Sequence, residues 1–307
     1  MKVVFCFPGQ GSQDVGMGHA IAQAIPEARA VYDEASAATG FDVARLCFEG
    51  PIEELTRTDM QQPALVATSL ACLRAVETLG VRADYVVGHS VGEYAALAAA
   101  GVITSRDAVV LVRERGAAMC EAAQEHPGAM AAVLGLEDAV VEELCADIDG
   151  VWPANYNCPG QVVVSGRHEA VDRLLERAAS LGARRAVKLR VSGAFHSPLV
   201  ARAAERLRPV IEHVSFREPL PPFVSTVTAK IETASRIGAL LIEQLTAPVR
   251  FTQAVRMLVR EGADLFVEIG PGQVLSGLLH RCDRSLRTVS VGDPAGLRKL
   301  EEALSPL

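Results

Sequence analysis

Residues 85–100 read YVVGHSVGEYAALAAA, and this stretch decides the fold. Tyr85–Val87 has the apolar character of a short buried strand, whereas the alanine-rich Glu93–Ala100 favours a helix. Between them Gly88–Gly92 matches G-x-S-x-G, the sharp strand-to-helix turn that exposes a nucleophilic serine. A side chain at either glycine would collide with the neighbouring elements. The stretch therefore predicts that Ser90 is a nucleophile at the carboxyl end of a sheet, the alternative being a plain tight turn.

Apolar segments on both sides of this turn alternate between strand and helix periodicity. The sequence predicts strands at Val3–Phe7, Pro222–Thr226 and Leu265–Glu268, and helices at Ile21–Ala38, Pro63–Leu79, Ser105–Ala123, Pro198–His213, Arg236–Leu245 and Thr252–Glu261. Such alternation is typical of an α/β domain built on a parallel sheet.

The middle of the chain has a different rhythm. Strand-like and helical segments follow one another there as Ala129–Leu136, Glu137–Ile148, Val151–Asn157, Gln161–Ser165, Glu169–Leu181 and Ala186–Val191. The order β-α-β-β-α-β is the split βαβ pattern of a ferredoxin-like unit. We therefore predict a large α/β subdomain, residues 1–125 and 193–307, that carries an inserted small α+β subdomain, residues 126–192.

Composition narrows the functional classes. Half of the 307 residues are apolar and the net charge is -7, which fits a globular protein and offers nucleic acid no overall attraction. The seven cysteines never form CxxC, so free thiols in a reducing compartment are favoured over disulfides or a zinc site. The longest soft apolar run, Ala95–Ile103, is about half of a membrane span. We expect a cytoplasmic protein with no metal and no membrane or nucleic-acid partner. A monomer is expected too, because no apolar stripe stays unassigned.

A nucleophilic serine needs a base, and seven histidines are available. His89 is a poor candidate, because successive side chains diverge in a tight turn. His196 lies in a loop between a predicted strand and a predicted helix, where bases are commonly placed, although a structural histidine is an equal alternative. No acid stands out between Ser90 and His196, so a carbonyl oxygen could hold the imidazole instead.

The glycine-rich segment after Val3–Phe7 raises a second possibility, a phosphate cradle. After Gly9 and Gly11 the third glycine position of GxGxxG holds Asp14, and the lysine of a P-loop is missing. A nucleotide site is therefore disfavoured. The backbone N–H groups of this loop could instead complete an oxyanion hole with the N–H of Val91.

Eight segments together resemble one known family. They are FPGQGSQ (Phe7–Gln13), QP (Gln62-Pro63), GHSVGEYAAL (Gly88–Leu97), RG (Arg115-Gly116), NCPGQVVVSG (Asn157–Gly166), AFHS (Ala194–Ser197), QLTAPVRF (Gln244–Phe251) and EIGPG (Glu268–Gly272). In this order, over nearly the whole chain, they resemble the malonyl-CoA:acyl carrier protein transacylase family, which includes the acyltransferase domains of polyketide synthases.

The resemblance implies a hydrolase-like large subdomain with a ferredoxin-like insertion, and a ping-pong reaction. It implies that Ser90 accepts malonyl from malonyl-CoA and passes it to the phosphopantetheine thiol of acyl carrier protein. His196 corresponds to the base, and Gln244 to the residue whose backbone carbonyl orients it. Gln10 and Val91 correspond to the oxyanion N–H donors. No cofactor is implied, since coenzyme A thioester and phosphopantetheine are substrates.

The resemblance also bears on substrate and partner. Arg115 corresponds to the arginine that binds the malonyl carboxylate, and Phe195 to a position where malonyl-selective members often carry Phe. Val91 stands where malonyl enzymes frequently have Leu, which slightly weakens the prediction of a malonyl substrate. Because carrier proteins are typically acidic, we expect a basic docking patch at Arg281 and Arg284. Arg184 and Arg185 are the other candidates for docking, and solvated surface charge is an equal alternative for all four.

Three alternatives stay open at this point. One is an acyl hydrolase that clears carrier-protein thioesters, which Arg115 disfavours because a cation facing an uncharged chain would be unpaired. Another is an acyltransferase with a different acyl substrate. A non-catalytic binding module is disfavoured by the presence of both Ser90 and His196. Fatty-acid and polyketide pathways are not separated, because their enzymes share every catalytic residue.

Overall fold

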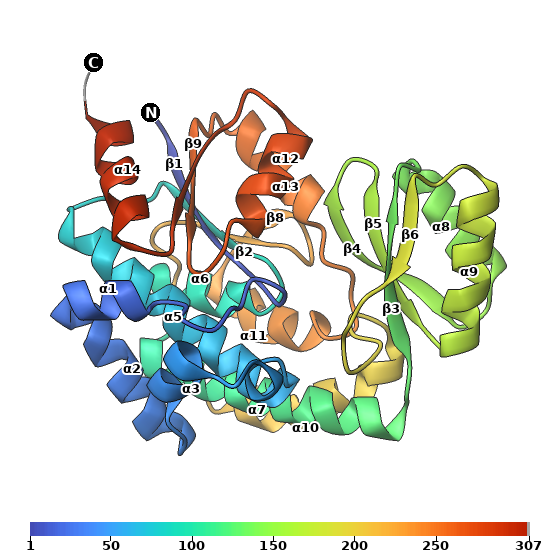
Figure 1. Cartoon of the computed structure of the whole chain (residues 1–307), viewed down its shortest axis with the longest axis horizontal. Coiled ribbons are helices and arrows are strands. Elements are labelled where there is room, and N and C mark those ends of the chain that lie inside the picture. The colour runs from blue at the N-terminus through green and yellow to red at the C-terminus, as the bar shows by residue number, and fades with distance from the viewer. Residues whose placement is uncertain (306–307) are drawn as a thin grey trace.

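The structure, a computed structural model, describes residues 1–305 and contains two sheets that lie side by side (Figure 1). The larger sheet has the order β10-β9-β1-β2-β7-β8. Its strands are β1 (Val3–Phe7), β2 (Tyr85–Gly88), β7 (Phe223–Ser225), β8 (Lys230–Glu232), β9 (Leu265–Ile269) and β10 (Arg287–Val291). Neighbouring strands from β10 to β7 are parallel, and β8 pairs antiparallel with β7 at the edge. This confirms the predicted central parallel sheet.

Helices cover both faces of the large sheet. Successive side chains of β1 point to opposite faces and are all buried, so each face needs a covering layer. Val3, Phe5 and Phe7 pack into one core with residues of α1 (His19–Ala24), α2 (Pro26–Thr39), α3 (Val43–Glu49), α4 (Ile52–Leu55), α5 (Thr58–Thr78), α6 (Gly92–Ala99), α7 (Ser105–Glu125), α10 (Ala201–Glu212), α11 (Ala234–Glu243) and α14 (Pro294–Leu304). Val4 and Cys6 pack on the other face with α12 (Phe251–Arg260) and α13 (Val274–Cys282). A strand buried on both faces reads as an unbroken apolar run, which is how VVFCF reads.

The smaller sheet has the order β4-β5-β3-β6, with every neighbouring pair antiparallel. Its elements are β3 (Ala129–Leu134), α8 (Asp138–Asp147), β4 (Val151–Cys158), β5 (Gln161–Gly166), α9 (His168–Ser180) and β6 (Arg185–Lys188). Helices α8 and α9 pack on one face through a core of their own. This is the predicted ferredoxin-like arrangement, and its open face turns toward the large sheet (Figure 1).

The predicted boundaries of the insertion, 125/126 and 192/193, stay a prediction. The first falls in the connection between α7 and β3. The second falls in the linker of residues 189–197, which joins β6 to the short 3-10 helix η1 (Pro198–Val200). Beyond this linker the two parts are joined by main-chain bonds, since Val249 exchanges hydrogen bonds with Ala154 and Tyr156 on β4. The open face of the small sheet is therefore held against the large subdomain.

Two predicted helices differ most from the structure in their limits, and a third, Pro198–His213, begins as the 3-10 helix η1 before α10. The pattern over residues 21–38 is two helices, because Pro26 begins α2 and Ile25 before it is extended. Helix α5 begins at Thr58, five residues before the predicted start at Pro63. Proline normally breaks a helix interior, because it lacks an N–H and leaves a carbonyl unpaired. Here the carbonyl of Asp59 accepts a hydrogen bond from Arg113 Nη1 at 3.2 Å, so the helix continues through Pro63.

Among the helices of residues 1–305, none combines the length and the apolar character that crossing a membrane requires.

Candidate active site

Ser90 occupies the sharp turn between β2 and α6. Its φ is 51°, in the left-handed region that non-glycine residues rarely adopt. A Cβ at Gly88 would lie 2.2 Å from the backbone N of Glu93, and one at Gly92 would lie 2.2 Å from the carbonyl oxygen of Phe7. Both positions therefore need glycine for close backbone approach. The turn places Ser90 at the carboxyl edge of the large sheet, as the motif predicts.

His196 meets Ser90 across the cleft. Its Nε2 lies 2.8 Å from Ser90 Oγ, and its Nδ1 lies 2.9 Å from the carbonyl oxygen of Gln244 and 3.2 Å from that of Ala247. A carbonyl can only accept, so Nδ1 carries the proton and Nε2 is the free base that faces the Ser90 hydroxyl. The turn after β2 and the segment after α11 thus supply the two ends of this chain of hydrogen bonds, and the linker of residues 189–197 supplies His196 in the middle.

The environment of His196 keeps the imidazole neutral. Burial, followed by the positive charge of Arg115, lowers its pKa from 6.5 to about 3. The two carbonyl acceptors oppose this shift, but desolvation dominates because the ring is 5% exposed. A neutral imidazole next to a hydroxyl is ready to take a proton at neutral pH.

Arg115 brings a positive charge to the same hydroxyl. Its Nη2 donates to Ser90 Oγ at 3.1 Å and to Gln244 Oε1 at 3.0 Å, while Nη1 donates to Gln62 Oε1 at 2.8 Å. The side chain is 1% exposed, and its Nε has no acceptor among residues 1–305. A buried guanidinium held only by neutral acceptors retains its capacity to bind a carboxylate.

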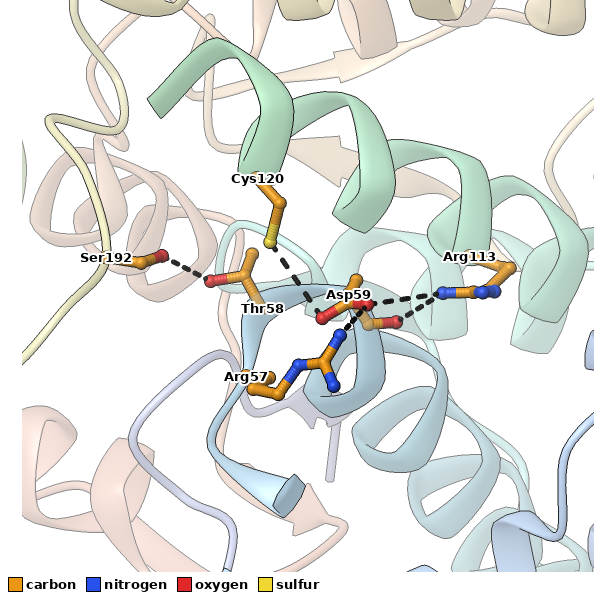
Figure 2. Close-up of polar contacts among 6 residues, drawn as sticks. All are labelled: Arg57, Thr58, Asp59, Arg113, Cys120 and Ser192. Carbon is orange, nitrogen blue, oxygen red and sulfur yellow. Dashed lines mark hydrogen bonds and ion pairs between the residues drawn. The ribbon is translucent and has the colours of Figure 1, made fainter. Parts of the chain in front are cut away.

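Arg113, two positions earlier on α7, points elsewhere. Figure 2 shows it directed at Asp59 together with Arg57, and its Nη1 lies 3.7 Å from the Asp59 carboxylate. Residues two apart on a helix occupy different faces, so only one of the two arginines reaches the cleft. The same picture shows Thr58 in contact with Ser192. Thr58 Oγ1 lies 2.9 Å from Ser192 Oγ, and this contact ties α5 to the linker of residues 189–197.

These groups surround a cavity of about 140 Å³ between the carboxyl edge of the large sheet and the open face of the small one. Its lining includes Gln10, His89, Ser90, Val91, Arg115, Met119, Met130, Asn155, Asn157, Val163, Leu189, Val191, Phe195 and His196. The structure thus gathers all the predicted oxyanion, substrate and catalytic residues around one space. Gln244 lies behind it, in contact with His196 and Arg115.

His89 is fixed as the tight turn predicts. Its Nε2 lies 2.9 Å from Asn157 Oδ1, and its ring packs against Phe251. Burial lowers its pKa. A Cβ on Gly9 would lie 2.5 Å from the carbonyl oxygen of His89, so the early glycine loop packs directly on the turn. His89 connects the loop, the turn and the small sheet without reaching the Ser90 hydroxyl.

The four predicted docking arginines lie outside the cavity. Arg281 is exposed near the end of α13, and its Nη1 donates to Gln161 Oε1 on the small sheet at 2.6 Å. Arg284 is exposed in the turn before β10. Arg185 begins β6, and Arg184 precedes it. The contact of Arg281 places α13 beside the small subdomain.

Sequence reasoning gave no role to three residues that the structure places in or behind the site. Gln62 holds Arg115 from α5. Glu93 and Thr226 form a buried pair behind Gln244. Gln62 and Glu93 do fall within the quoted segments QP and GHSVGEYAAL, and that was the available signal. Within the part of the chain that the structure describes, no group of three or more His, Cys, Asp or Glu side chains is arranged to hold a metal ion.

Comparisons with known proteins agree with this geometry. The sequence family described as "Acyl transferase domain" matches residues 4–302. The malonyl CoA-acyl carrier protein transacylase of Bacillus subtilis is 44% identical over 298 residues, 95% of this chain and 94% of that protein.

Two solved structures are similar over almost their whole length. The malonyl CoA-acyl carrier protein transacylase of Coxiella burnetii has a TM-score of 0.97 at 36% identity, covering 100% of this chain and 98% of that one. A malonyl-transacylase solved in complex with a type II PKS acyl-carrier protein has a TM-score of 0.95 at 40% identity, covering 99% and 100%. With a serine in a sharp strand-to-helix turn, and a buried histidine and an arginine on its hydroxyl, the chain belongs to the malonyl CoA-acyl carrier protein transacylase family.

Proposed function

We propose that this protein moves a malonyl group from coenzyme A to the phosphopantetheine thiol of an acyl carrier protein, through an ester on Ser90. One observation carries the proposal. The buried series Ser90 Oγ, His196 and the Gln244 carbonyl forms an activated nucleophile, and Arg115 donates to the same Oγ. The activated nucleophile can carry out acyl transfer, and the Arg115 guanidinium can bind a carboxylate on the acyl group.

Acylation begins with proton transfer from the Ser90 hydroxyl to His196 Nε2. The serine oxygen attacks the thioester carbonyl, and the backbone N–H groups of Gln10 and Val91 stabilise the resulting oxyanion. The C–S bond then breaks, and His196 returns the proton to the departing coenzyme A sulfur. Ser90 is left as the malonyl ester and His196 as the neutral base.

Deacylation repeats these steps with a different nucleophile. The phosphopantetheine thiol gives its proton to His196 Nε2, and the sulfur attacks the ester carbonyl. The ester C–O bond breaks, and His196 protonates the departing Ser90 oxygen. Because burial lowers the pKa of His196, its protonated form releases this proton more readily than an imidazolium in water would.

A carbonyl in place of the usual acid is consistent with this cycle. The Gln244 and Ala247 carbonyls fix the tautomer and the ring orientation, which are the geometric duties of a triad carboxylate. They carry no negative charge, so they raise the pKa of His196 less than a carboxylate would. Both thiols enter as substrates, so the scheme needs no cofactor. All of its residues come from one chain, which supports a monomer as the working unit.

The acyl group is expected to carry a carboxylate. Arg115 is buried and contacts Ser90 Oγ, so a carboxylate two bonds beyond an esterified carbonyl lies within its reach. An uncharged acyl chain would leave this guanidinium without an anionic partner in a desolvated site. The buried Arg115 therefore favours malonyl transfer over hydrolysis of simple acyl chains.

His196→Ala tests the proposed cycle. Loss of the base is expected to slow acylation by malonyl-CoA and transfer to carrier protein alike, each by about two to four orders of magnitude. The two half-reactions are measured separately, by intact mass after malonyl-CoA and by transfer from the isolated ester.

The matched control is His89→Ala, which removes the other histidine of the cavity. Because His89 bonds Asn157 and not Ser90, its loss is expected to lower thermal stability more than either rate constant. A faster half-reaction in His196→Ala than in His89→Ala, with both proteins folded by circular dichroism, would reverse the assignment.

We also propose that the acidic carrier protein docks on Arg281 and Arg284. Arg284→Glu is expected to raise the KM for carrier protein several-fold and to leave the KM for malonyl-CoA unchanged, because a rim charge steers only the partner that touches it. Arg298→Glu, on the exposed side of α14, makes the same charge change elsewhere. Steady-state kinetics at low ionic strength measures both. Equal effects of the two variants would show that only net charge matters.

A further inference from the structure

Glu93 is a buried carboxylate that the proposed cycle does not use. It lies in the first turn of α6, three residues after the nucleophile, and is 1% exposed. Its Oε1 accepts hydrogen bonds from the backbone N–H of Thr226 and, at 2.7 Å, from the Thr226 hydroxyl. Its Oε2 accepts from Gln244 Nε2. Burying a charge without an ionic partner in direct contact costs free energy, which indicates that Glu93 has a role in the site.

The carboxylate fixes the orientation of the Gln244 amide. An ionised Glu93 can only accept, so Gln244 must present its NH₂ group to Glu93. The same Nε2 also donates to the Ser90 carbonyl at 3.1 Å. The amide oxygen is thereby turned toward Arg115, whose Nη2 donates to it at 3.0 Å. With the amide reversed, two N–H donors would face each other at Arg115.

The amide also keeps the two charges apart. A direct pair between Glu93 and Arg115 would occupy the guanidinium and leave little for a substrate carboxylate. With Gln244 between them, the buried anion still compensates the buried cation while Arg115 is bound only by neutral acceptors, among them Gln62 Oε1 at 2.8 Å. Arg115 is thus held in one orientation, stays charged, and can still bind a substrate carboxylate.

We propose that Glu93 is a positioning residue that orients the Gln244 amide and, through it, aims Arg115, so that the site selects malonyl over uncharged acyl groups. The proposal rests on the proposed role of Arg115 as the carboxylate clamp. The Glu93 side chain has no contact with Ser90 Oγ, and Glu93 is not among the residues that line the cavity, so its effect is expected on selectivity more than on the proton transfers.

Glu93→Gln provides the direct test. Three hydrogen-bond donors point at the Glu93 carboxylate, two from Thr226 and one from the Gln244 NH₂ group. The amide that replaces it has an NH₂ group of its own, which must face the donors of Thr226 or that of Gln244. The kcat/KM for malonyl-CoA is expected to fall by about ten- to a hundredfold, while that for acetyl-CoA changes by less than about threefold. The readout is the malonyl-to-acetyl ratio of kcat/KM in the acylation half-reaction.

Glu268→Gln is the matched control. Glu268 is also fully buried and accepts two backbone N–H bonds, from Leu275 at 2.9 Å and Ser276 at 2.8 Å, at the end of β9. Its loss is expected to reduce stability and leave the ratio unchanged. An equal fall in the ratio in both variants would mean that any buried carboxylate matters, and would overturn the proposal.

Gln244→Ala gives a second route that does not alter Glu93. It keeps the backbone carbonyl that holds His196 but removes the amide, so kcat/KM is expected to fall more for malonyl-CoA than for acetyl-CoA, and the ratio falls. If Glu93 acts through this amide, adding Glu93→Gln to Gln244→Ala should lower the ratio by less than about twofold more. Full additivity of the two effects would overturn the proposal.

The wild-type protein offers a readout without any substitution. Burial raises the pKa of Glu93 to about 7, so protonation as pH falls through 7 is expected to lower the malonyl-to-acetyl ratio. Arg115 and Tyr94 are the titratable groups whose charges act on Glu93, and His89 and His196 are the titratable groups that line the cavity. Arg115 stays protonated and Tyr94 neutral at these pH values, and the lowered pKa values of both histidines keep them neutral. In Glu93→Gln this pH dependence should disappear.

Parallel measurement of Arg115→Ala separates the two proposals. A ratio unchanged in Glu93→Gln but lowered in Arg115→Ala would overturn the positioning role and leave the clamp. A ratio unchanged in both variants would overturn the clamp, and the positioning role with it.

Discussion

Ser90→Ala is expected to abolish the malonyl adduct that wild-type protein forms with malonyl-CoA. Alanine has no oxygen to attack the thioester, and no other hydroxyl of residues 1–305 lies at the carboxyl edge of β2 within hydrogen-bonding distance of an imidazole nitrogen. Losing a nucleophile that acts together with its base costs on the order of 10⁴-fold or more in rate. Intact mass spectrometry should show one malonyl group on wild type, mapped to the peptide that contains Gly88–Gly92.

Ser69→Ala is the control for this substitution. Ser69 is also a buried serine, but it lies on α5 and outside the cavity lining, so adduct formation should match that of wild type. Because Arg115 and His196 both contact Ser90 Oγ, circular dichroism and thermal melting must show that Ser90→Ala is folded. An adduct that forms on folded Ser90→Ala at the wild-type rate would remove Ser90 as the nucleophile.

Arg115→Ala is expected to change what the site accepts. The malonyl carboxylate would lose its guanidinium, and removing one partner of a buried charge pair typically costs about 2–5 kcal/mol. At 1.36 kcal/mol per tenfold, the kcat/KM for malonyl-CoA should fall about 30- to 5,000-fold. Acetyl transfer should persist or improve, because Ser90, His196 and the oxyanion donors remain. The measurement is the malonyl-to-acetyl ratio of kcat/KM.

The same helix supplies the control. Arg113→Ala removes a guanidinium two positions away that bonds Asp59 on α5, so the ratio should stay at its wild-type value. Arg115→Lys keeps the charge but loses the two parallel N–H groups, and an intermediate ratio is expected. An unchanged ratio in Arg115→Ala would place malonyl selectivity outside this side chain.

The features that the sequence predicted well are local ones. The turn around Ser90 needs a strand, two glycines and a helix within about fifteen residues, and all of these are visible in the sequence. The small subdomain has a periodicity of its own. The separation of Arg113 from Arg115 also follows from helix geometry alone, since two residues amount to about 200° of rotation.

The features that sequence patterns could not predict depend on distant partners. Any residue offers a carbonyl, so nothing about Gln244 distinguishes it as the support of His196 apart from the family resemblance. Glu93 looks like a solvated charge in the first turn of a helix, yet it is buried because Thr226 and Gln244 reach it from 133 and 151 residues away. The early start of α5 depends in the same way on Arg113, which accommodates Pro63 from another helix.

The left-handed backbone of Ser90 also restricts how this enzyme can evolve. Threonine differs from serine by one methyl group and performs nucleophilic chemistry in other enzymes. Its branched Cβ is poorly tolerated at a φ of 51°, where crowding between side chain and backbone is already severe. Cysteine is unbranched and would fit the same backbone. The turn that exposes the nucleophile thus leaves few single substitutions that could still carry an acyl group.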